Sequence, residues 1–245
     1  MGDPVGAPDP ELPATPPAAR TLFGERIELA ERFVARLADS GVSHGLIGPR
    51  EVPRLWDRHV LNCAVIGEAI AADVDVIDVG SGAGLPGVAL AIARPDLRVV
   101  LVEPLERRVR WLEGGIAELG LANVVVRRGK AQAFAGELSA PVVTARAVSR
   151  LANLAQWCGP LVQRGGVLLA MKGGSAPAEL AEDRAALRRA GFDGEEVLEL
   201  GAGLVDPPTI VVRAVRARSA TGPGAHGGGA RASRGRSGRP GRRLK

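Results

Sequence analysis

The sequence contains no tyrosine, and it has only four phenylalanines and three tryptophans among its 245 residues. Apolar residues nevertheless make up 46% of the chain. A hydrophobic core must therefore be built chiefly from Ala, Val and Leu, whose burial supplies most of the favourable free energy of folding. The length suits one domain of about 200 residues with flexible ends.

Cysteines are also scarce, since only Cys63 and Cys158 are present. Two are too few for a disulfide framework, and we predict buried free thiols in a reducing cytoplasm. No apolar run approaches the roughly 20 residues that a membrane span needs. The N-terminus is rich in proline and acid, which does not fit a secretory signal. We expect a cytoplasmic monomer that binds neither a membrane nor a metal ion.

Acidic residues are absent from positions 213–245, which contain nine Arg and one Lys. The whole chain has a net charge of +5, whereas the first 212 residues have 22 basic and 27 acidic side chains. The positive charge therefore belongs to the C-terminal tail. Nucleic-acid binding by the folded body would have to rest on local clusters of basic residues.

The chain divides into four predicted segments. Residues 1–20 hold six prolines, and residues 215–245 are rich in Gly, Arg and Ser; we expect both to be disordered. Residues 21–72 are predicted to form a helical extension, and residues 73–214 an α/β domain.

Two helices are predicted in the extension. Apolar residues recur at helical spacing from Leu22 to Leu37, which predicts an amphipathic helix. Gly41 and the Gly48-Pro49 pair are expected to end it. A second helix is expected from Trp56 to Ile70.

Beyond residue 73, short apolar runs alternate with helical patterns. The predicted strands are Val74–Val79, Arg98–Val102, Val124–Val126, Pro141–Ala145, Val167–Met171 and Ile210–Val212, and the predicted helices are Leu85–Ala93, Glu106–Leu119, Leu151–Leu161 and Ala178–Ala190. This alternation predicts an α/β fold with a mostly parallel, doubly wound sheet that has helices on both faces.

A glycine-rich segment, Asp78-Val79-Gly80-Ser81-Gly82-Ala83-Gly84, follows the first predicted strand. Glycine permits positive φ and lets a ligand approach the backbone, and ligands of such sheets bind at the carboxyl ends of strands. The run from Gly82 to Gly87 also satisfies the dinucleotide pattern G-x-G-x-x-G. The turn start at Gly80, the preceding Asp78 and the later Pro86 favour S-adenosylmethionine instead.

Two further residues could contact such a cofactor. Glu103 ends the second predicted strand, 19 residues after Gly84, where a carboxylate can accept hydrogen bonds from both ribose hydroxyls; alternatively it is a solvated strand-end acid. Gln132 follows the third strand and could pair with the adenine edge, or it could simply cap a short helix at the surface.

The fourth predicted strand bears on the chemistry. Its end, Val142 to Ala147, has neither the Pro pair nor the aromatic residue of amino-group methyltransferases, and Cys158 lies far away in a predicted helix. A ring nitrogen with a free lone pair, such as guanine N7, needs alignment and no general base, so we assign no catalytic residue. Arg146 could bond the cofactor carboxylate, or guanine O6 and phosphate, or it could cover the sheet edge.

Residues Asp78 to Gly87, Asp-Val-Gly-Ser-Gly-Ala-Gly-Leu-Pro-Gly, resemble the signature of the bacterial 16S ribosomal RNA guanine-N7 methyltransferases, the RsmG (GidB) family. Further segments follow in the family's order, namely Trp56–Leu61, Arg107–Leu112, Thr144–Ala147, Trp157-Cys158 and Ala170–Gly173. The resemblance covers residues 22–213. It implies the class I methyltransferase fold, Rossmann-like with a seven-stranded sheet, and methyl transfer to N7 of a guanine.

The resemblance also implies site residues. S-adenosylmethionine would be bound by Gly80 and Leu85 of the glycine loop, and by Glu103, Ala131, Gln132 and Arg146. The glycine pattern itself adds Gly82 to these cofactor residues. The family commonly has Glu at position 132 and Arg at position 130, where this chain has Gln and Lys.

The implied partner is 16S ribosomal RNA or a small-subunit precursor. We expect Arg58, His59 and Arg146 to contact it, although His59 could instead make one structural hydrogen bond. A basic face could add to RNA binding; it comprises Arg107, Arg108, Arg110, Arg127, Arg128, Lys130, Arg146, Arg150 and Lys172.

Three other functions fit parts of the sequence. The chain could be a methyltransferase of the same fold that acts on a small molecule or a protein. It could be a nicotinamide-dependent oxidoreductase that uses Gly82–Gly87 to bind NAD. It could also be a catalytically silent RNA-binding protein.

Overall fold

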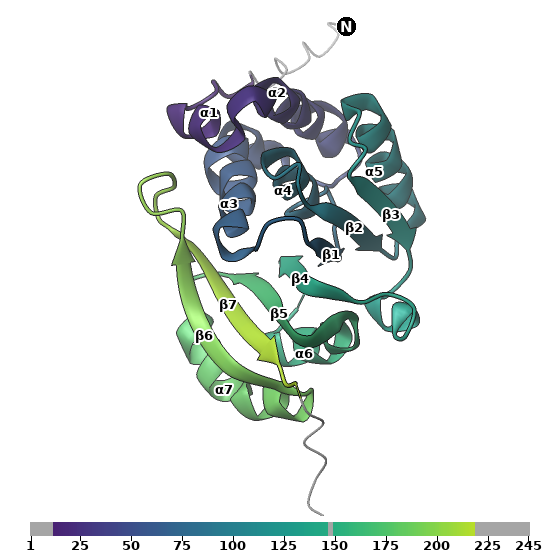
Figure 1. Cartoon of the computed structure of the whole chain (residues 1–245). Coiled ribbons are helices and arrows are strands. Elements are labelled where there is room, and N and C mark those ends of the chain that lie inside the picture. The colour runs from purple at the N-terminus through teal and green to yellow at the C-terminus, as the bar shows by residue number, and fades with distance from the viewer. Residues whose placement is uncertain (1–11, 147–148, 219–245) are drawn as a thin grey trace, which may run out of the picture.

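The computed structural model describes residues 12–146 and 149–218, and a seven-stranded sheet forms its centre (Figure 1). The strands are β1 (Asp75–Val79), β2 (Arg98–Glu103), β3 (Val124–Arg128), β4 (Ala140–Arg146), β5 (Val162–Lys172), β6 (Phe192–Leu200) and β7 (Thr209–Arg216). Their order is β3-β2-β1-β4-β5-β7-β6. β1 to β5 pair in parallel, and β7 is antiparallel to both β5 and β6. The predicted doubly wound, mostly parallel sheet is confirmed.

Helices cover both faces of this sheet. They are α1 (Pro17–Phe23), α2 (Ile27–Arg36), α3 (Leu61–Ala64), α4 (Gly87–Ala93), α5 (Glu106–Leu119), α6 (Leu151–Cys158) and α7 (Ala176–Arg189). Shorter 3-10 or π segments are Gly24–Arg26, Leu37–Gly41, Pro49–Arg54, Leu55–Val60, Val65–Ala69, Ala131–Phe134 and Gly159–Leu161. No described helix is long and apolar enough to cross a membrane.

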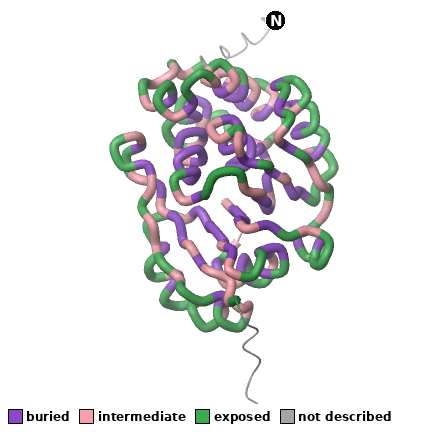
Figure 2. The backbone as a smooth tube through the Cα atoms, in the orientation of Figure 1, coloured by how far each residue is buried: buried purple, intermediate pink, exposed green. Residues whose placement is uncertain are grey.

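The core has two halves, one on each face of the sheet. Val76 and Val142 pack on the face covered by α1 to α5, and their neighbours Ile77 and Val143 pack on the face covered by α6 and α7. This division follows from the period-2 alternation of strand side chains. In Figure 2, the residues coloured as buried accordingly lie along the strands in the middle of the molecule.

The helical extension is packed directly on the sheet. One hydrophobic cluster joins Phe23, Phe33 and Leu55 of the extension to Val76 and Leu101 of the sheet. Residues of the extension can therefore contribute to a site at the edge of the sheet.

The two cysteines, Cys63 and Cys158, are both free and buried, as predicted.

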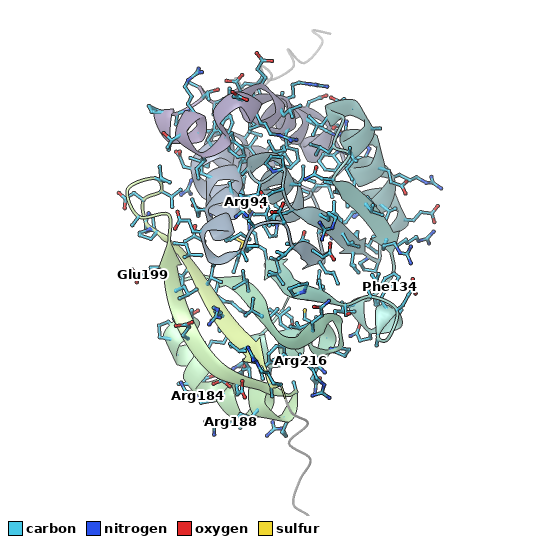
Figure 3. The ribbon with its side chains drawn as sticks, in the orientation of Figure 1. Arg94, Phe134, Arg184, Arg188, Glu199 and Arg216 are labelled. Atoms are coloured by element: carbon cyan, nitrogen blue, oxygen red, sulfur yellow. The ribbon has the colours of Figure 1, made fainter. Side chains whose placement is uncertain are left out.

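Arg94, labelled in Figure 3, ties the end of α4 to the last turn of the extension. Its guanidinium donates to the carbonyl oxygens of Gly67 and Ile70, at 2.8 and 3.1 Å, and pairs with Asp96 at 2.6 Å. Hydrogen bonds to charged groups each contribute about 1.5–3 kcal/mol. Arg94 thus links the two parts of the molecule more strongly than a surface ion pair does.

We expect Arg94→Met to lower the free energy of unfolding by about 2–4 kcal/mol, because the carbonyl oxygens of Gly67, Ile70 and Ala71 lose the hydrogen bonds that the guanidinium donates to them. Urea denaturation measures this value. Arg98→Met is the control, since the Arg98–Asp75 pair is largely exposed and should contribute less than about 1 kcal/mol. Equal losses for the two variants would contradict this role of Arg94.

Some predicted elements were wrong at their ends or in kind. Disorder through residue 20 was wrong for residues 17–20, because Pro17 occupies the first turn of α1 and Ala19 is buried. The predicted helix from Trp56 to Ile70 is a π turn, one α turn and a 3-10 turn in succession. The Gly48-Pro49 pair was predicted to end a helix, but Gly48 is the N-cap and Pro49 the first residue of the 3-10 turn Pro49–Arg54.

The strand β6 was not predicted. It lies at the edge of the sheet and pairs only with β7. Four of its nine residues are exposed and only Phe192 is buried, so it lacks the continuous apolar run of the central strands. β7 extends to Arg216, two residues past the predicted domain end. The predicted disordered residues 1–11 and 219–245 lie outside the described residues.

Candidate cofactor and substrate site

The glycine loop lies where the chain order of the sheet reverses, between β2 and β4 at the end of β1. Ligands of open α/β sheets bind in the crevice at this position. Gly80, Gly82 and Gly84 have φ values of 73°, 55° and 83°, which side chains with a Cβ rarely adopt. The Gly80 N–H donates to the carbonyl oxygen of Val102 at 2.8 Å, which closes the loop against β2.

Asp78 is fully buried beneath this loop. One carboxylate oxygen accepts the Thr144 hydroxyl at 2.9 Å, and the other accepts the Gly87 N–H at 3.2 Å. Burial raises the pKa of Asp78 to about 6, although these hydrogen bonds oppose the shift. Asp78 therefore joins β1, β4 and the first turn of α4, and it has a structural role within the loop.

A cavity of about 460 Å³ opens beside the loop, at the ends of β1 to β4. Its size is typical of small-molecule sites. The walls combine apolar groups with a few polar ones; they comprise Val79, Gly80, Val102, Glu103, Pro104, Leu105, Arg108, Gly129, Lys130, Ala131, Gln132, Arg146 and Trp157. We call this space the loop cavity.

Glu103 lies on the loop-cavity wall but is only 1% exposed. Its two carboxylate oxygens accept the backbone N–H groups of Gly82 and Leu105, each at 3.0 Å. Each carboxylate oxygen has two lone pairs, so each keeps one lone pair that no described hydrogen bond uses, and Arg108 Nη1 lies 3.9 Å from Oε2. The alternative interpretation, in which Glu103 is a solvated acid at the strand end, does not hold because the side chain is buried.

Five of the predicted cofactor residues line the loop cavity, namely Gly80, Glu103, Ala131, Gln132 and Arg146. Two do not. The Gly82 N–H is engaged by Glu103, and Leu85 packs into the hydrophobic core. Gly82 and Leu85 belong to the loop that borders the cavity, but neither residue lies on the cavity wall.

Sequence reasoning assigned no cofactor role to several wall residues. Leu105 is 45% exposed, unusual for a large apolar side chain in this molecule, and Trp157 reaches the same cavity from α6. Gly129 lies so close to Phe134 that a Cβ added to it would come within 2.8 Å of the ring. The position of Leu105, two residues after the strand-end acid, was the available signal.

A second cavity of about 690 Å³ lies on the other side of Arg146. It is formed by the extension, the end of β5 and the loop before β7; its wall residues are Arg54, Asp57, Arg58, Asn62, Arg146, Met171, Lys172, Gly173, Gly174, Asp206, Pro207, Pro208, Thr209 and Ile210. We call it the acceptor-side cavity. Of the described residues on the two walls, Arg146 is the one they share.

Arg146 is held by two groups from the extension. Its Nη2 lies 2.5 Å from His59 Nδ1, and its Nη1 donates to Cys63 Sγ at 3.0 Å. Burial raises the pKa of the Cys63 thiol to about 11, with Arg146 opposing the shift. Among the described residues, no carboxylate lies within ion-pair distance of Arg146.

The three predicted RNA-contact residues differ in their surroundings. Arg58 and Arg146 line the acceptor-side cavity, whereas His59 lies on neither cavity wall. The other ring nitrogen of His59, Nε2, lies 2.7 Å from Glu51 Oε2. Both ring nitrogens are therefore engaged within the protein. This arrangement matches the alternative considered for His59, a structural hydrogen bond in place of an RNA contact.

Most of the predicted basic face is paired with carboxylates. Arg110 and Arg128 both pair with Glu106, and Arg127 pairs with Glu137. Lys172 binds Glu179 at 2.8 Å, and Arg150 is paired with two acids. These pairs reduce the net charge of the face. Among the described residues, Arg107, Lys130 and Arg146 of this face are in no ion pair, and of these three Arg146 lies between the two cavities and is held by neutral groups.

The arrangement does not suit a dinucleotide. Pyrophosphate in such folds binds at the N-terminus of the helix after the loop. Here that N-terminus is occupied by the Asp78 carboxyl group, which accepts the Gly87 N–H. The described residues contain no group of three His, Cys, Asp or Glu side chains placed to bind a metal ion.

Solved structures with the same fold include an O-methyltransferase family protein from Burkholderia thailandensis and a methyltransferase from Pyrococcus furiosus. The first has a TM-score of 0.52 at 14% identity and covers 81% of this chain and 68% of its own. The second has a TM-score of 0.51 at 11% identity, with 64% and 83% covered. These likenesses show the class I methyltransferase fold.

Sequence relatives are much closer. Proteins named ribosomal RNA small subunit methyltransferase G from Paenarthrobacter aurescens and Salinispora arenicola are 54% and 53% identical to this chain. The alignments cover 81% and 89% of this chain and 92% of each relative. The family model described as rRNA small subunit methyltransferase G, GidB, matches residues 26–205. The resemblance found in the sequence is thus confirmed, and the chain belongs to the rRNA small subunit methyltransferase G (GidB) family.

Proposed function

We propose that this chain transfers a methyl group from S-adenosylmethionine to N7 of a guanine in 16S ribosomal RNA. The position of Arg146 carries the proposal, because this cation lies on the walls of both the loop cavity and the acceptor-side cavity and is held by neutral groups. A methyltransferase needs its cofactor and its acceptor in adjoining spaces, so that the reacting atoms can be aligned.

The walls of the loop cavity fit S-adenosylmethionine. The apolar side chains of Leu105, Ala131 and Val102 suit the adenine ring, and Gln132 offers an amide to its edge. Glu103 retains acceptor sites for the ribose hydroxyls. Arg146 can bind the carboxylate of the amino-acid end through the guanidinium donors that His59 and Cys63 leave free.

The cofactor supplies an electrophilic methyl group on a sulfonium. Guanine N7 carries a lone pair and no proton, so its methylation needs alignment without a general base. The end of β4 provides Arg146 and Thr144, and the Thr144 hydroxyl is donated to Asp78. Arg146 can hold guanine O6 or a phosphate at the boundary of the cavities. The chain's contribution is therefore to bind and orient, which agrees with the absence of an assigned catalytic base.

We further propose that residues 21–72 and 73–214 divide the work, with the extension shaping the acceptor-side cavity and the α/β part holding the cofactor. Arg54 and Arg58 of the extension face that cavity, where they can bind RNA phosphates. The substrate is 16S RNA, alone or within a small-subunit precursor. We expect a cytoplasmic monomer with no metal requirement, since the reaction needs neither a Lewis acid nor a base.

Glu103 provides a test of the cofactor assignment. We expect Glu103→Gln to weaken S-adenosylmethionine binding about tenfold, because a charged acceptor is lost. Isothermal calorimetry measures the affinity. Glu137→Gln is the matched control, since Glu137 pairs with Arg127 away from the cavity.

A ligand lacking the ribose 2′-hydroxyl separates a ligand contact from a loop effect. Removing that hydroxyl from methylthioadenosine should weaken binding to the native protein more than to the Glu103→Gln variant. Equal losses in both proteins would show that Glu103 acts only on the loop. Binding of NAD without binding of S-adenosylmethionine would overturn the cofactor assignment. The acceptor assignment is tested by mapping N7-methylguanosine in 16S RNA with and without this chain.

A further inference from the structure

Three side chains from three segments form a line that ends between the two cavities. Glu51 belongs to the 3-10 segment Pro49–Arg54, His59 to the π segment Leu55–Val60, and Arg146 to the end of β4. Glu51 Oε2 lies 2.7 Å from His59 Nε2, and His59 Nδ1 lies 2.5 Å from Arg146 Nη2. Glu51 thus contacts Arg146 only through the imidazole ring.

These two contacts select one tautomer of His59. An ionised carboxylate only accepts hydrogen bonds and a guanidinium only donates them. Both contacts are satisfied only when His59 is neutral, with its proton on Nε2 and its lone pair on Nδ1. Burial and the positive charge of Arg146 lower the pKa of His59 from its usual 6.5, although Glu51 opposes the shift. The ring is therefore neutral at physiological pH.

The consequence concerns the charge of Arg146. A carboxylate in direct contact would orient the guanidinium but would also neutralise it, as Glu179 does for Lys172. A neutral imidazole and a neutral thiol orient Arg146 and leave its charge for a ligand. Placing Glu51 one ring away provides orientation without direct pairing.

We propose that Glu51 is a positioning residue, which acts through His59 to hold the Arg146 guanidinium at the boundary of the two cavities with its charge available to an anionic group. The inference rests on the proposed function for the identity of that group, either the cofactor carboxylate or an RNA phosphate. The orientation itself depends only on the contacts within the protein.

The proposal has a pH dependence of defined sign. Protonation of His59 removes the acceptor for Arg146 and sets two cations against each other, so methyl transfer falls as the pH drops through the pKa of His59, below 6.5. The other charged groups that face this line are Arg58, 3.2 Å from Glu51 Oε1, together with Arg54 beside Glu51 and Asp78 beneath Arg146. Because Glu51 raises the pKa of His59, removing Glu51 should move the acid limb to lower pH.

The test compares Glu51→Ala and Glu51→Gln in the full-length protein. We expect the alanine variant to lose about tenfold in kcat, the lower end of the losses seen when the hydrogen-bond partner of a metal-binding histidine is removed. Glutamine keeps an acceptor oxygen for His59 Nε2 and should recover most of that loss. Glu137→Gln again serves as the control and should retain native activity.

Nitrogen-15 NMR of the imidazole rings provides a readout that needs no RNA. The His59 signals are assigned by their absence from a His59→Gln spectrum. We expect a neutral Nε2–H tautomer in the native protein and a mixture of tautomers in Glu51→Ala. This result would stand even if the methyl acceptor were not 16S RNA, so failure of the proposed function can be told from failure of the positioning role.

Three outcomes would overturn the proposal. One is a native His59 protonated on Nδ1, which could not accept a hydrogen bond from Arg146. The second is a Glu51→Ala variant with native kcat and an unshifted acid limb. The third is a Glu51→Ala variant whose loss of activity glutamine does not reduce. In the last case Glu51 would contribute only to the stability of the extension.

Discussion

Replacing Arg146 by alanine is expected to slow methyl transfer about 100-fold, the size of effect seen when one preorganised donor is removed from an active site. The reason is its location on both cavity walls, with its charge unneutralised. Arg146→Lys should retain part of the activity, since an ammonium keeps the charge but cannot bond His59 and Cys63 in the same planar geometry. Single-turnover rates with labelled S-adenosylmethionine measure the chemical step.

Arg150→Ala is the matched control for Arg146. Arg150 lies only four residues further on, but it is 61% exposed and pairs with Glu182 and Asp183. Exposed pairs contribute little, so this variant should stay within about threefold of the native rate. If Arg150→Ala lost as much activity as Arg146→Ala, a general loss of positive charge would explain both results, and the special position of Arg146 would be disproved.

Substituting Gly87 by alanine is expected to lower the free energy of unfolding by about 3 kcal/mol, at the upper end of the range for overpacked sites. A Cβ there would lie 2.3 Å from Leu101 Cδ2 and 2.8 Å from Asp78 Oδ2. Asp78 cannot withdraw without breaking its bond to Thr144. Urea denaturation gives the stability, and calorimetry should show weaker S-adenosylmethionine binding because the glycine loop is displaced.

Gly114→Ala provides the control for this prediction. Gly114 is exposed in the middle of α5, and the nearest atom to its added Cβ is the flexible end of Arg36, at 3.2 Å. Alanine is favoured over glycine inside helices by about 1 kcal/mol, so we expect little change or a small gain in stability. A Gly87→Ala variant as stable as the native protein would contradict the tight packing described for the loop.

The parts of the fold with continuous patterns were predictable from the sequence. Glu106–Leu119 was predicted with the same ends that α5 has, because its apolar spacing is uninterrupted and Gly120 adopts the left-handed conformation that ends a helix. The edge strand β6 was not predictable in this way, because four of its nine residues are exposed. The hydrophobic pattern in the sequence was therefore clearest for the elements that are most buried in the structure.

The site was predictable wherever a strand end supplied the residue. Glu103 and Arg146 terminate β2 and β4, and strand ends of a parallel sheet meet at one edge. The sequence could not show which atoms of the glycine loop face a ligand, so Gly82 was assigned from the glycine pattern and Leu85 from the family resemblance. Nor could it show Glu51, because its role depends on two short helical segments that bring it against His59.

The most direct measurement is a map of N7-methylguanosine in 16S ribosomal RNA from a strain in which the gene for this chain is deleted. The deletion strain should lose the N7 methyl group at one guanine of 16S RNA. A plasmid copy of the native gene should restore it, and a stable Arg146→Ala copy should not. If no guanine of 16S RNA lost its N7 methyl group in the deletion strain, guanine-N7 methyl transfer to 16S RNA would be contradicted.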